Sequence, residues 1–294
     1  MKRTYSTADL AKLLSVNEST IKRWSDTGDL PCVKTRGGHR RFPIALVMEF
    51  VRTNKLSANV LAVDTIENED LQAHVLAGHT DRLLPDMKRE MLSGNLQAVL
   101  RILRIAFAAK PNLLELFEEV VFPPLVEIGE EWHRGTVTID QEHIASNTLR
   151  EALALFQAEI FHKDPHGLTA LCACYETELH DIVLRCIAYF LEVAGWKVLF
   201  LGQSTPVNAI VQAIKTKKPH LVALSATIVN NERNFLNAVN QRIQPAAHRV
   251  RAKFILGGHR IKERFSDRIK ADYLCDSIRD CETLTNPNIY KRTA

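Results

Sequence analysis

The sequence predicts a multidomain protein of mixed α and α/β class. Its expected parts are an N-terminal winged helix-turn-helix, a helical bundle, and a C-terminal flavodoxin-like (Rossmann-like) domain with a five-stranded parallel sheet. Two short amphipathic helices followed by a basic hairpin predict the first part. Unbroken helical periodicity predicts the second. From residue 168 short apolar runs alternate with amphipathic helices, which is typical of a parallel sheet covered on both faces.

The composition is that of an ordinary globular protein. Of 294 residues, 46% are hydrophobic and 24% are charged, which excludes fibrous and disordered classes. No apolar run approaches the roughly 20 residues that span a bilayer. The N-terminus is polar and lacks the apolar region of a secretory signal, and six Cys without a regular framework indicate reduced thiols. We therefore expect a cytoplasmic protein without a membrane partner.

Positive charge is concentrated at the N-terminus. Residues 1–55 contain eleven Lys or Arg and five Asp or Glu, a net charge of +6 in a chain whose total is +4. The rest of the chain therefore sums to about −2. This asymmetry predicts an anionic partner for the N-terminal segment.

The periodicity divides the chain into four parts. We expect the winged helix-turn-helix over residues 1–54, a polar linker over 55–75, the bundle over 76–163 and the Rossmann-like domain over 167–294. The five expected strands are Leu168–Cys174, Lys197–Leu201, Leu221–Ala226, Lys253–Leu256 and Tyr273–Cys275.

The N-terminal part is predicted to bind DNA. Thr7 is expected to cap a first helix, a second helix follows from Ser19, and a third helix runs from Pro43 to Thr53. A Gly37-Gly38 pair between extended segments predicts a hairpin with a basic tip, and such a wing can neutralise phosphates while a helix enters the major groove. The expected DNA-binding residues are Ser19, Thr20, Lys22, Arg23, Lys34, Arg36, His39, Arg40 and Arg41. The wing string from Gly37 to Phe42 resembles the MerR family of transcription regulators.

Short motifs follow four of the expected strands. They are Glu178-Leu-His-Asp-Ile-Val183, Gly202 with Thr205-Pro206, Ser225-Ala-Thr227 and Gly257-Gly258. In a doubly wound sheet these strand ends form the ligand-binding edge. In this order the motifs resemble the cobalamin-binding Rossmann-like domain. The resemblance implies that the cofactor contacts Glu178, His180, Asp181, Ser225, Thr227, Gly257 and Gly258.

His180 matches the lower cobalt ligand of that domain family. A neutral imidazole can ligate cobalt, and a carboxylate two residues away can orient its other ring nitrogen. The glycines let the backbone approach the nucleotide tail of the cofactor. One position departs from the family pattern, because Val183 stands where the family has Gly and its side chain can crowd that tail.

The bundle carries a Trp-x9-Glu-His motif, formed by Trp132, Glu142 and His143. Trp offers a flat apolar surface, and Glu and His offer hydrogen bonds. With the order of domains, this motif resembles the CarH/CarA family of cobalamin-dependent photoreceptor repressors. The resemblance implies that the motif surrounds the adenosyl group of adenosylcobalamin. It also implies that His133 ligates cobalt from above after light has expelled that group.

The resemblance implies a transcriptional repressor and not an enzyme. In darkness the protein would hold adenosylcobalamin and bind double-stranded operator DNA as a homo-oligomer, dimer or tetramer; light would release it. One alternative is a MerR-type repressor that acts without cobalamin, or senses the cobalamin level or another ligand. A second is a methyltransferase-like cobalamin enzyme, but no residues remain for a substrate-binding domain.

Overall fold

The computed structural model describes residues 4–14, 16–35, 37–43, 46–47, 49–50, 68–160 and 162–290. The chain forms two compact units, Met1–Phe156 and Gln157–Ala294. The predicted fold class is confirmed: an N-terminal helix-turn-helix, a helical domain and a five-stranded parallel sheet. Arg36, residues 55–67 of the expected linker and much of the expected helix from Pro43 to Thr53 lie outside the described residues.

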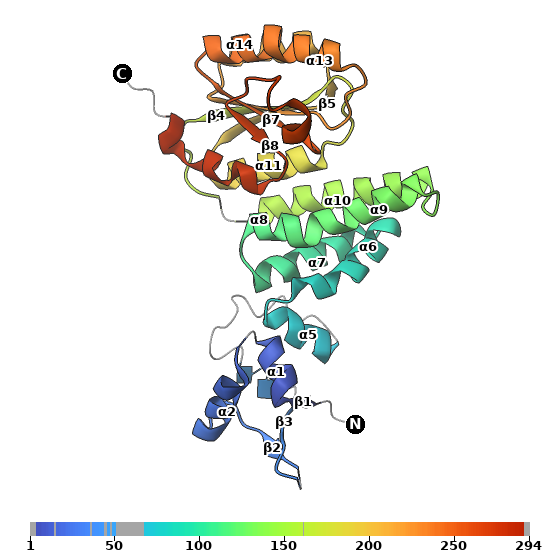
Figure 1. The fold of residues 1–294 in the computed structure, drawn as a ribbon, viewed down its shortest axis with the longest axis vertical. Helices are drawn as coiled ribbons and strands as arrows, with labels where there is room; N and C mark the ends of the chain where they lie inside the picture. The colour runs from blue at the N-terminus through green and yellow to red at the C-terminus, as the bar shows by residue number, and fades with distance from the viewer. Residues whose placement is uncertain are drawn as a thin grey trace. The chain divides into compact units, whose positions relative to one another are not determined.

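Over its described residues the N-terminal part shows the helices α1 and α2, helical residues at 46–47 and 49–50, and a small antiparallel sheet with strand order β1-β3-β2 (Figure 1). The elements are β1 Thr4–Ser6, α1 Thr7–Leu13, α2 Glu18–Thr27, β2 Val33–Lys34 and β3 Arg40–Pro43. The hydroxyl of Ser6 accepts a hydrogen bond from the Asp9 N–H at 3.1 Å, and the Asp9 carboxylate accepts one from the Ser6 N–H at 3.2 Å. Ser6, and not Thr7 as predicted, therefore makes the cap of α1.

A helix lies within the residues expected to form a linker. Helix α5, Glu69–Leu76, begins after Asn68, whose side chain accepts hydrogen bonds from the N–H groups of Asp70 and Leu71. The Tyr5 hydroxyl donates to Asp70 Oδ1 at 2.8 Å, so β1 is tied to this helix. The sequence did not reveal this helix because the segment around it is polar, and its cap and its contact with Tyr5 are also polar.

The helical domain follows. Its elements are η1 Thr80–Leu83, α6 Leu84–Leu92, α7 Leu96–Ala109, α8 Leu113–Leu116, η2 Phe117–Val121, α9 Phe122–His133 and α10 Ile139–Glu159. Helices α8 and α9 are joined through η2, a π-helical turn directly before Pro123 and Pro124. Proline lacks an N–H, and a wider turn accommodates the missing hydrogen bond. No helix among the described residues is both long and apolar enough to span a bilayer.

The second unit is built on the sheet β5-β4-β6-β7-β8, whose strands are all parallel. The strands are β4 Thr169–Tyr175, β5 Lys197–Thr205, β6 Leu221–Ser225, β7 Lys253–Gly257 and β8 Tyr273–Cys275, at the five predicted places. Numbered within the domain the order is 2-1-3-4-5, which is the flavodoxin-like order.

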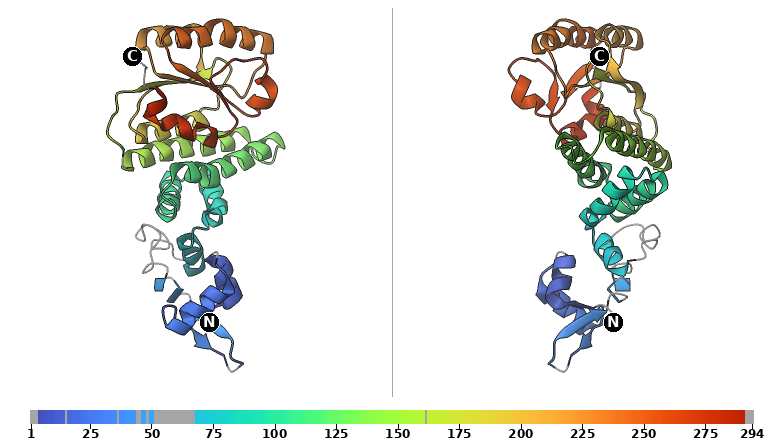
Figure 2. Two further views of the ribbon diagram at one scale, coloured as in Figure 1. Left: turned by 60° about the vertical axis from the view of Figure 1, so that its left-hand side comes forward. Right: turned by 90° about the vertical axis from the view of Figure 1, so that its right-hand side faces the viewer.

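Helices cover both faces of this sheet (Figure 2). One face packs against α11 Ile182–Val193, η4 Arg279–Thr285 and η5 Pro287–Tyr290. The other packs against α12 Val207–Lys217, α13 Glu232–Ala238, η3 Val239–Ile243, α14 Gln244–Arg249 and α15 Ile261–Phe265. Strand β4 is buried on both faces: Leu171 and Ala173 join one core, and Cys172 and Cys174 join the other. This two-sided burial explains the continuous apolar run in the sequence.

Candidate functional site

The carboxyl ends of the central strands bring the predicted motifs side by side. Cys174 at the end of β4 pairs with Ser225 of β6, which pairs with Gly257 of β7. The loops that carry Glu178, Thr227 and Gly258 therefore leave the sheet at one edge. This is the edge where doubly wound sheets bind their ligands.

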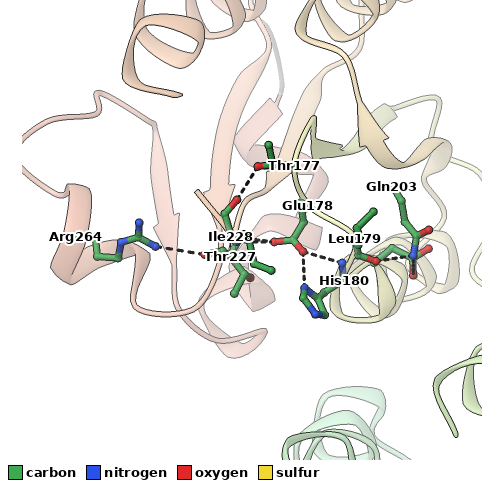
Figure 3. A network of polar contacts seen from close by, with 9 residues as sticks. Thr177, Glu178, Leu179, His180, Gln203, Thr227, Ile228 and Arg264 are labelled. Carbon is green, nitrogen blue, oxygen red and sulfur yellow. Dashed lines mark hydrogen bonds and ion pairs between the residues drawn. The ribbon is translucent and has the colours of Figure 1, made fainter. Parts of the chain in front are cut away.

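Glu178 is the centre of a polar network at this edge (Figure 3). Its side chain is fully buried, and Oε1 accepts hydrogen bonds from the backbone N–H of His180 and from its ring nitrogen Nδ1, both at 2.7 Å. Oε2 accepts the N–H groups of Thr227, at 2.5 Å, and Ile228, at 3.2 Å. One carboxylate thus joins the loop after β4 to the loop after β6.

These contacts fix the charge of Glu178 and the tautomer of His180. Burial alone raises the pKa of the Glu178 carboxyl, but the hydrogen bonds from His180, Thr227 and Ile228 outweigh burial and hold that pKa below its ordinary value. An ionised carboxylate only accepts hydrogen bonds, so Nδ1 of His180 carries a proton. The Nε2 atom is then the ring nitrogen with a lone pair for a metal, and the His180 side chain is 64% exposed.

The loop that carries His180 is held by Asp181 together with Arg185 and Gln203, two residues that the motifs did not reveal. The Asp181 carboxylate is buried and accepts a hydrogen bond from Arg185 Nε at 2.7 Å. Gln203 Nε2 donates to the Leu179 carbonyl at 2.5 Å and to Asp181 Oδ1 at 3.2 Å. Gln203 therefore binds the residues on both sides of His180, Leu179 through its backbone carbonyl and Asp181 through its side chain. Only its place directly after Gly202, at a strand end, could have pointed to it.

The surroundings of His180 fit a large apolar ligand. Four apolar side chains on the elements around this edge are exposed: Leu179 and Ile228 in loops, Val183 in α11 and Leu201 in β5. Val183 stands in the first turn of α11 and is 44% exposed, so the core does not require it. Among the described residues no group of three or more His, Cys, Asp or Glu could hold a metal ion. A single histidine can bind a metal whose other ligands come from a macrocycle, so His180 fits a metal of that kind.

The two glycines after β7 differ in their surroundings. A Cβ atom on Gly258 would lie 2.4 Å from the Ala226 carbonyl oxygen, so the close approach of these two loops requires glycine. A Cβ on Gly257 would meet Cys275 O at 3.5 Å, an ordinary contact. Gly258 is therefore needed for the packing of the edge, whereas Gly257 is free to serve a ligand.

The predicted residues of the bundle lie in the first unit, on either side of one turn. Trp132 and His133 end α9, and both are exposed. Gly135, with φ +77°, opens the turn, and the Glu131 carbonyl accepts the N–H groups of Thr136 and Val137. The Trp132 side chain is 45% exposed, so part of its apolar surface is available to a ligand.

Glu142 and His143 stand in the first turns of α10. Glu142 Oε1 accepts a hydrogen bond from Ser146 at 2.6 Å, and Glu142 Oε2 lies 3.7 Å from His143 Nε2. His143 is 66% exposed. Over the described residues there is no polar contact between this pair and Trp132 or His133. The four residues are related only by their positions at the end of α9 and near the start of α10.

The predicted DNA-binding residues lie on α2 and the wing. Ser19, Lys22 and Arg23 are exposed on α2, and Thr20 is half-buried. On the wing, Lys34, His39 and Arg41 are exposed. Gly38, with φ +76°, forms the tip, and Thr35 and His39 close it through a backbone hydrogen bond of 2.9 Å.

Arg40 has a different environment from Arg41. It shares a strand face with buried Phe42, and its guanidinium forms an ion pair with Asp26 of α2 at 2.6 Å. Only 21% of its side chain is exposed, whereas Arg41 projects from the opposite face. The structure thus joins Arg40 to the helix and leaves Arg41 facing outward.

Three family patterns match the chain. Residues 4–55 match a helix-turn-helix domain, and residues 83–157 and 168–276 each match a B12 binding domain. The helical domain and the sheet domain are thus both B12-binding domains, the first a helical cap and the second Rossmann-like.

Individual relatives agree with this composition. The chain is 29% identical to the HTH-type transcriptional repressor CarH of Myxococcus xanthus over 250 residues, 80% of this chain and 82% of that protein. It is 25% identical to trimethylamine corrinoid protein 1 of Methanosarcina mazei, over 60% of this chain and 82% of that protein. The structure of the Methanosarcina barkeri monomethylamine corrinoid protein superposes with a TM-score of 0.57 at 16% identity, covering 68% of this chain and 94% of the other.

The helix-turn-helix domain and the two B12-binding domains together define a cobalamin-binding transcriptional regulator. Within that class the chain is a CarH-like regulator, since similarity to the CarH repressor extends over most of both proteins. The similarity to corrinoid proteins is confined to 60% of the chain or thereabouts and belongs to the shared B12-binding fold.

Proposed function

We propose that this protein is a light-sensing repressor that uses adenosylcobalamin, holds its operator in darkness and releases it in light. The observation that carries the proposal is the Glu178–His180 pair at the carboxyl edge of the sheet. It presents an imidazole that is oriented through Nδ1 by a buried carboxylate, in a chain that also carries a DNA-binding domain. The similarity to a repressor along most of the chain supports regulation over catalysis.

Each group of residues has an assigned task. His180 would hold cobalt through Nε2, and Ser225, Thr227, Gly257 and Gly258 would receive the nucleotide tail. Trp132 packs on the adenosyl group, while Glu142 and His143 hydrogen-bond it. Bound adenosylcobalamin supplies a cobalt–carbon bond that visible or near-ultraviolet light breaks. After loss of the adenosyl group His133 would be available to hold the metal, and such a contact would favour the protein state that has left DNA.

The lower ligand is tested by absorption spectroscopy in darkness. His180→Ala is expected to weaken adenosylcobalamin binding at least tenfold, or to change its visible spectrum, because the imidazole that Glu178 orients toward the metal is removed. His162→Ala is the matched control for loss of an exposed histidine outside the proposed site, and its affinity and spectrum should be those of wild type. A wild-type spectrum and affinity in His180→Ala would exclude lower ligation.

The upper ligand is tested after illumination. His133→Ala should leave binding in darkness intact and shorten the lifetime of the photoproduct, because the exposed imidazole at the end of α9 is removed. His259→Ala, an exposed histidine of the second unit, is the control. A photoproduct with unchanged spectrum and lifetime in His133→Ala would contradict the assignment.

Val183 favours one alternative function, a repressor that works without cobalamin. Its exposed side chain stands where cobalamin-binding relatives of the resembled family have Gly. Val183→Gly separates the two functions. If wild type binds adenosylcobalamin and the variant binds no more than a few-fold tighter, Val183 is tolerated and the light-sensing function stands. If only the variant binds, the natural protein represses in the cofactor-free state.

A further inference from the structure

A second basic segment lies far from the DNA-binding domain in the sequence. Residues 193–262 contain eleven Lys or Arg and a single acidic residue, Glu232, for a net charge of +10. The N-terminus is therefore not the only basic part of the chain, although the sum of about −2 for all later residues suggested that it was. The acidic residues on either side of the segment cancel it in the total.

Five of these cations gather at the amino-terminal edge of the sheet in the second unit. They are Lys215, Lys217, Lys218, Arg249 and Arg251, called here the amino-edge cluster, and all are exposed. The first three end α12 and the other two end α14.

The fold brings the two helix ends together. Helices α12 and α14 pack on the same face of the sheet. The strands that follow them, β6 and β7, are neighbours in which Leu221 pairs with Lys253. The Lys253 N–H donates to the His220 carbonyl at 2.9 Å. Because paired strands lie about 4.8 Å apart, the residues just before them are close neighbours.

The cluster has no carboxylates of its own. Within the described part of the chain, none of its five side chains forms an ion pair or a side-chain hydrogen bond. Asp272 binds Lys253 at 3.2 Å and His248 at 3.3 Å, and neither of these residues belongs to the cluster. Other cations of the unit, such as Arg260 and Lys262, have acidic partners. The five charges therefore repel one another without local compensation.

Two members occupy positions that disfavour a side chain. Lys218 has φ +44° and Arg251 has φ +60°, the left-handed region that glycine adopts at the ends of helices. Attraction of cations to the carboxyl end of a helix accounts for Lys215, Lys217 and Arg249 in the last turns. It does not require a cation in place of glycine at both following positions.

The chemistry of the surface indicates its partner. Among the described residues, α12 and α14 carry no exposed large apolar side chain. Protein partners are bound through buried aromatic and apolar anchors, whereas nucleic-acid backbones are bound by Lys and Arg. We propose that the amino-edge cluster is a second DNA-binding surface, which contacts backbone phosphates outside the sequence read by the helix-turn-helix domain. This inference rests on the proposed function as a DNA-binding regulator.

The test measures DNA affinity of the full chain against salt concentration, with a mixed-sequence duplex. Lys217→Gln/Arg249→Gln should lower the slope of log affinity against log salt by up to about 2, since each lost phosphate contact removes about 0.9. The matched control is Arg89→Gln/Arg101→Gln in the helical domain, which removes the same charge and should leave the slope unchanged.

Each other outcome is decisive. An unchanged slope in Lys217→Gln/Arg249→Gln, or an equal fall in the control, overturns the second surface. Salt-sensitive self-association that this variant abolishes, with DNA affinity intact, would assign the cluster to a protein partner and also overturn it. If wild type binds no duplex under any condition, the failure belongs to the proposed function, whereas normal wild-type binding with an unchanged slope rejects the cluster alone.

Discussion

Two neighbouring arginines on β3 show how one position along a strand decides a side chain's role. Arg40 is directed toward α2, where Asp26 binds it, and Arg41 is directed to solvent. Successive residues of a strand face opposite sides, so the pair cannot do the same work. Arg41 is available to a phosphate, while Arg40 sets the position of the wing relative to α2.

We therefore expect different consequences from the two substitutions. Arg41→Gln should weaken DNA binding and reduce its salt slope by about 0.9. Arg40→Gln should weaken binding with an unchanged slope, because it loosens the wing and removes no phosphate contact. Charge exchange in Asp26→Arg/Arg40→Asp should recover part of the Arg40→Gln loss. An equal fall in slope for both single variants would make Arg40 a phosphate contact after all.

The buried carboxylate of Glu178 predicts a specific acid sensitivity. Because its pKa is below the ordinary 4.5, ionised Glu178 stabilises the folded state above that pH. This stabilisation is lost as the pH falls below 4.5 and through the lowered folded pKa. Glu178→Gln should cost about 1–3 kcal/mol at neutral pH, since an amide cannot accept all four hydrogen bonds.

Denaturant unfolding at neutral pH and below pH 4.5 checks this prediction. The difference between wild type and Glu178→Gln should shrink in acid, where the wild-type carboxyl is protonated. Glu263→Gln, which removes an exposed carboxylate paired with Arg260, should cost little at either pH. A Glu178→Gln penalty that does not depend on pH would mean that the loss is steric.

Motif spacing predicted site residues that follow directly after a strand. It missed residues whose role depends on a contact with a residue distant in the sequence. His180 and Glu178 are two apart after a strand, so their meeting follows from local geometry. Gln203 reaches Leu179 and Asp181 from a neighbouring strand, and Asp26 meets Arg40 fourteen residues away. Such pairs depend on tertiary packing, which a single sequence does not encode as a pattern.

At the scale of elements, the close approach of the loops after β6 and β7 governs the ligand edge. In Gly258→Ala the new Cβ would overlap the Ala226 carbonyl, so one loop must move. We expect a loss of about 1–3 kcal/mol in unfolding free energy and displacement of Thr227, which binds Glu178. Gly257→Ala meets only ordinary contacts and should unfold like wild type.

Thermal unfolding and cobalamin titration of these two variants separate packing from binding. Gly258→Ala should lose both stability and affinity, and Gly257→Ala should lose affinity alone if the tail approaches that backbone. Stability lost equally in both variants would show that the edge is simply intolerant of a methyl group.

Element type was predictable where burial is two-sided or periodic. All five parallel strands appeared at their expected places, and for the central strands the reason is that both faces are buried and leave a continuous apolar run. Strand β1 was not anticipated, since its three residues are too short for a pattern and pair only with β3. Helix α5 was missed because it lies in a segment that is polar overall, and only its last turn, with Val75 and Leu76, supplies buried apolar residues.

At the scale of the whole molecule, regulation requires that cofactor state and DNA affinity be coupled. A single helix-turn-helix of this size makes few contacts, and linking copies converts later contacts into intramolecular ones worth 10²–10⁴ in avidity. Under the proposed function, a change of assembly is therefore the change through which light would alter DNA affinity most strongly. A ligand can shift an assembly only by its differential affinity for the two states.

Size-exclusion chromatography with adenosylcobalamin, in darkness and after green light, tests this coupling. We expect the cofactor to co-elute with a larger species in darkness and a smaller one after light, with operator affinity falling about 100-fold or more as avidity is lost. Hydroxocobalamin is the control, because it lacks the adenosyl group and should give the small species in both conditions. Co-elution without a change of size would leave a sensor of cobalamin level whose DNA affinity does not depend on assembly. Absence of co-elution, with DNA binding intact, would mean that Val183 closes the cofactor site and that another signal acts on the same two-unit chain.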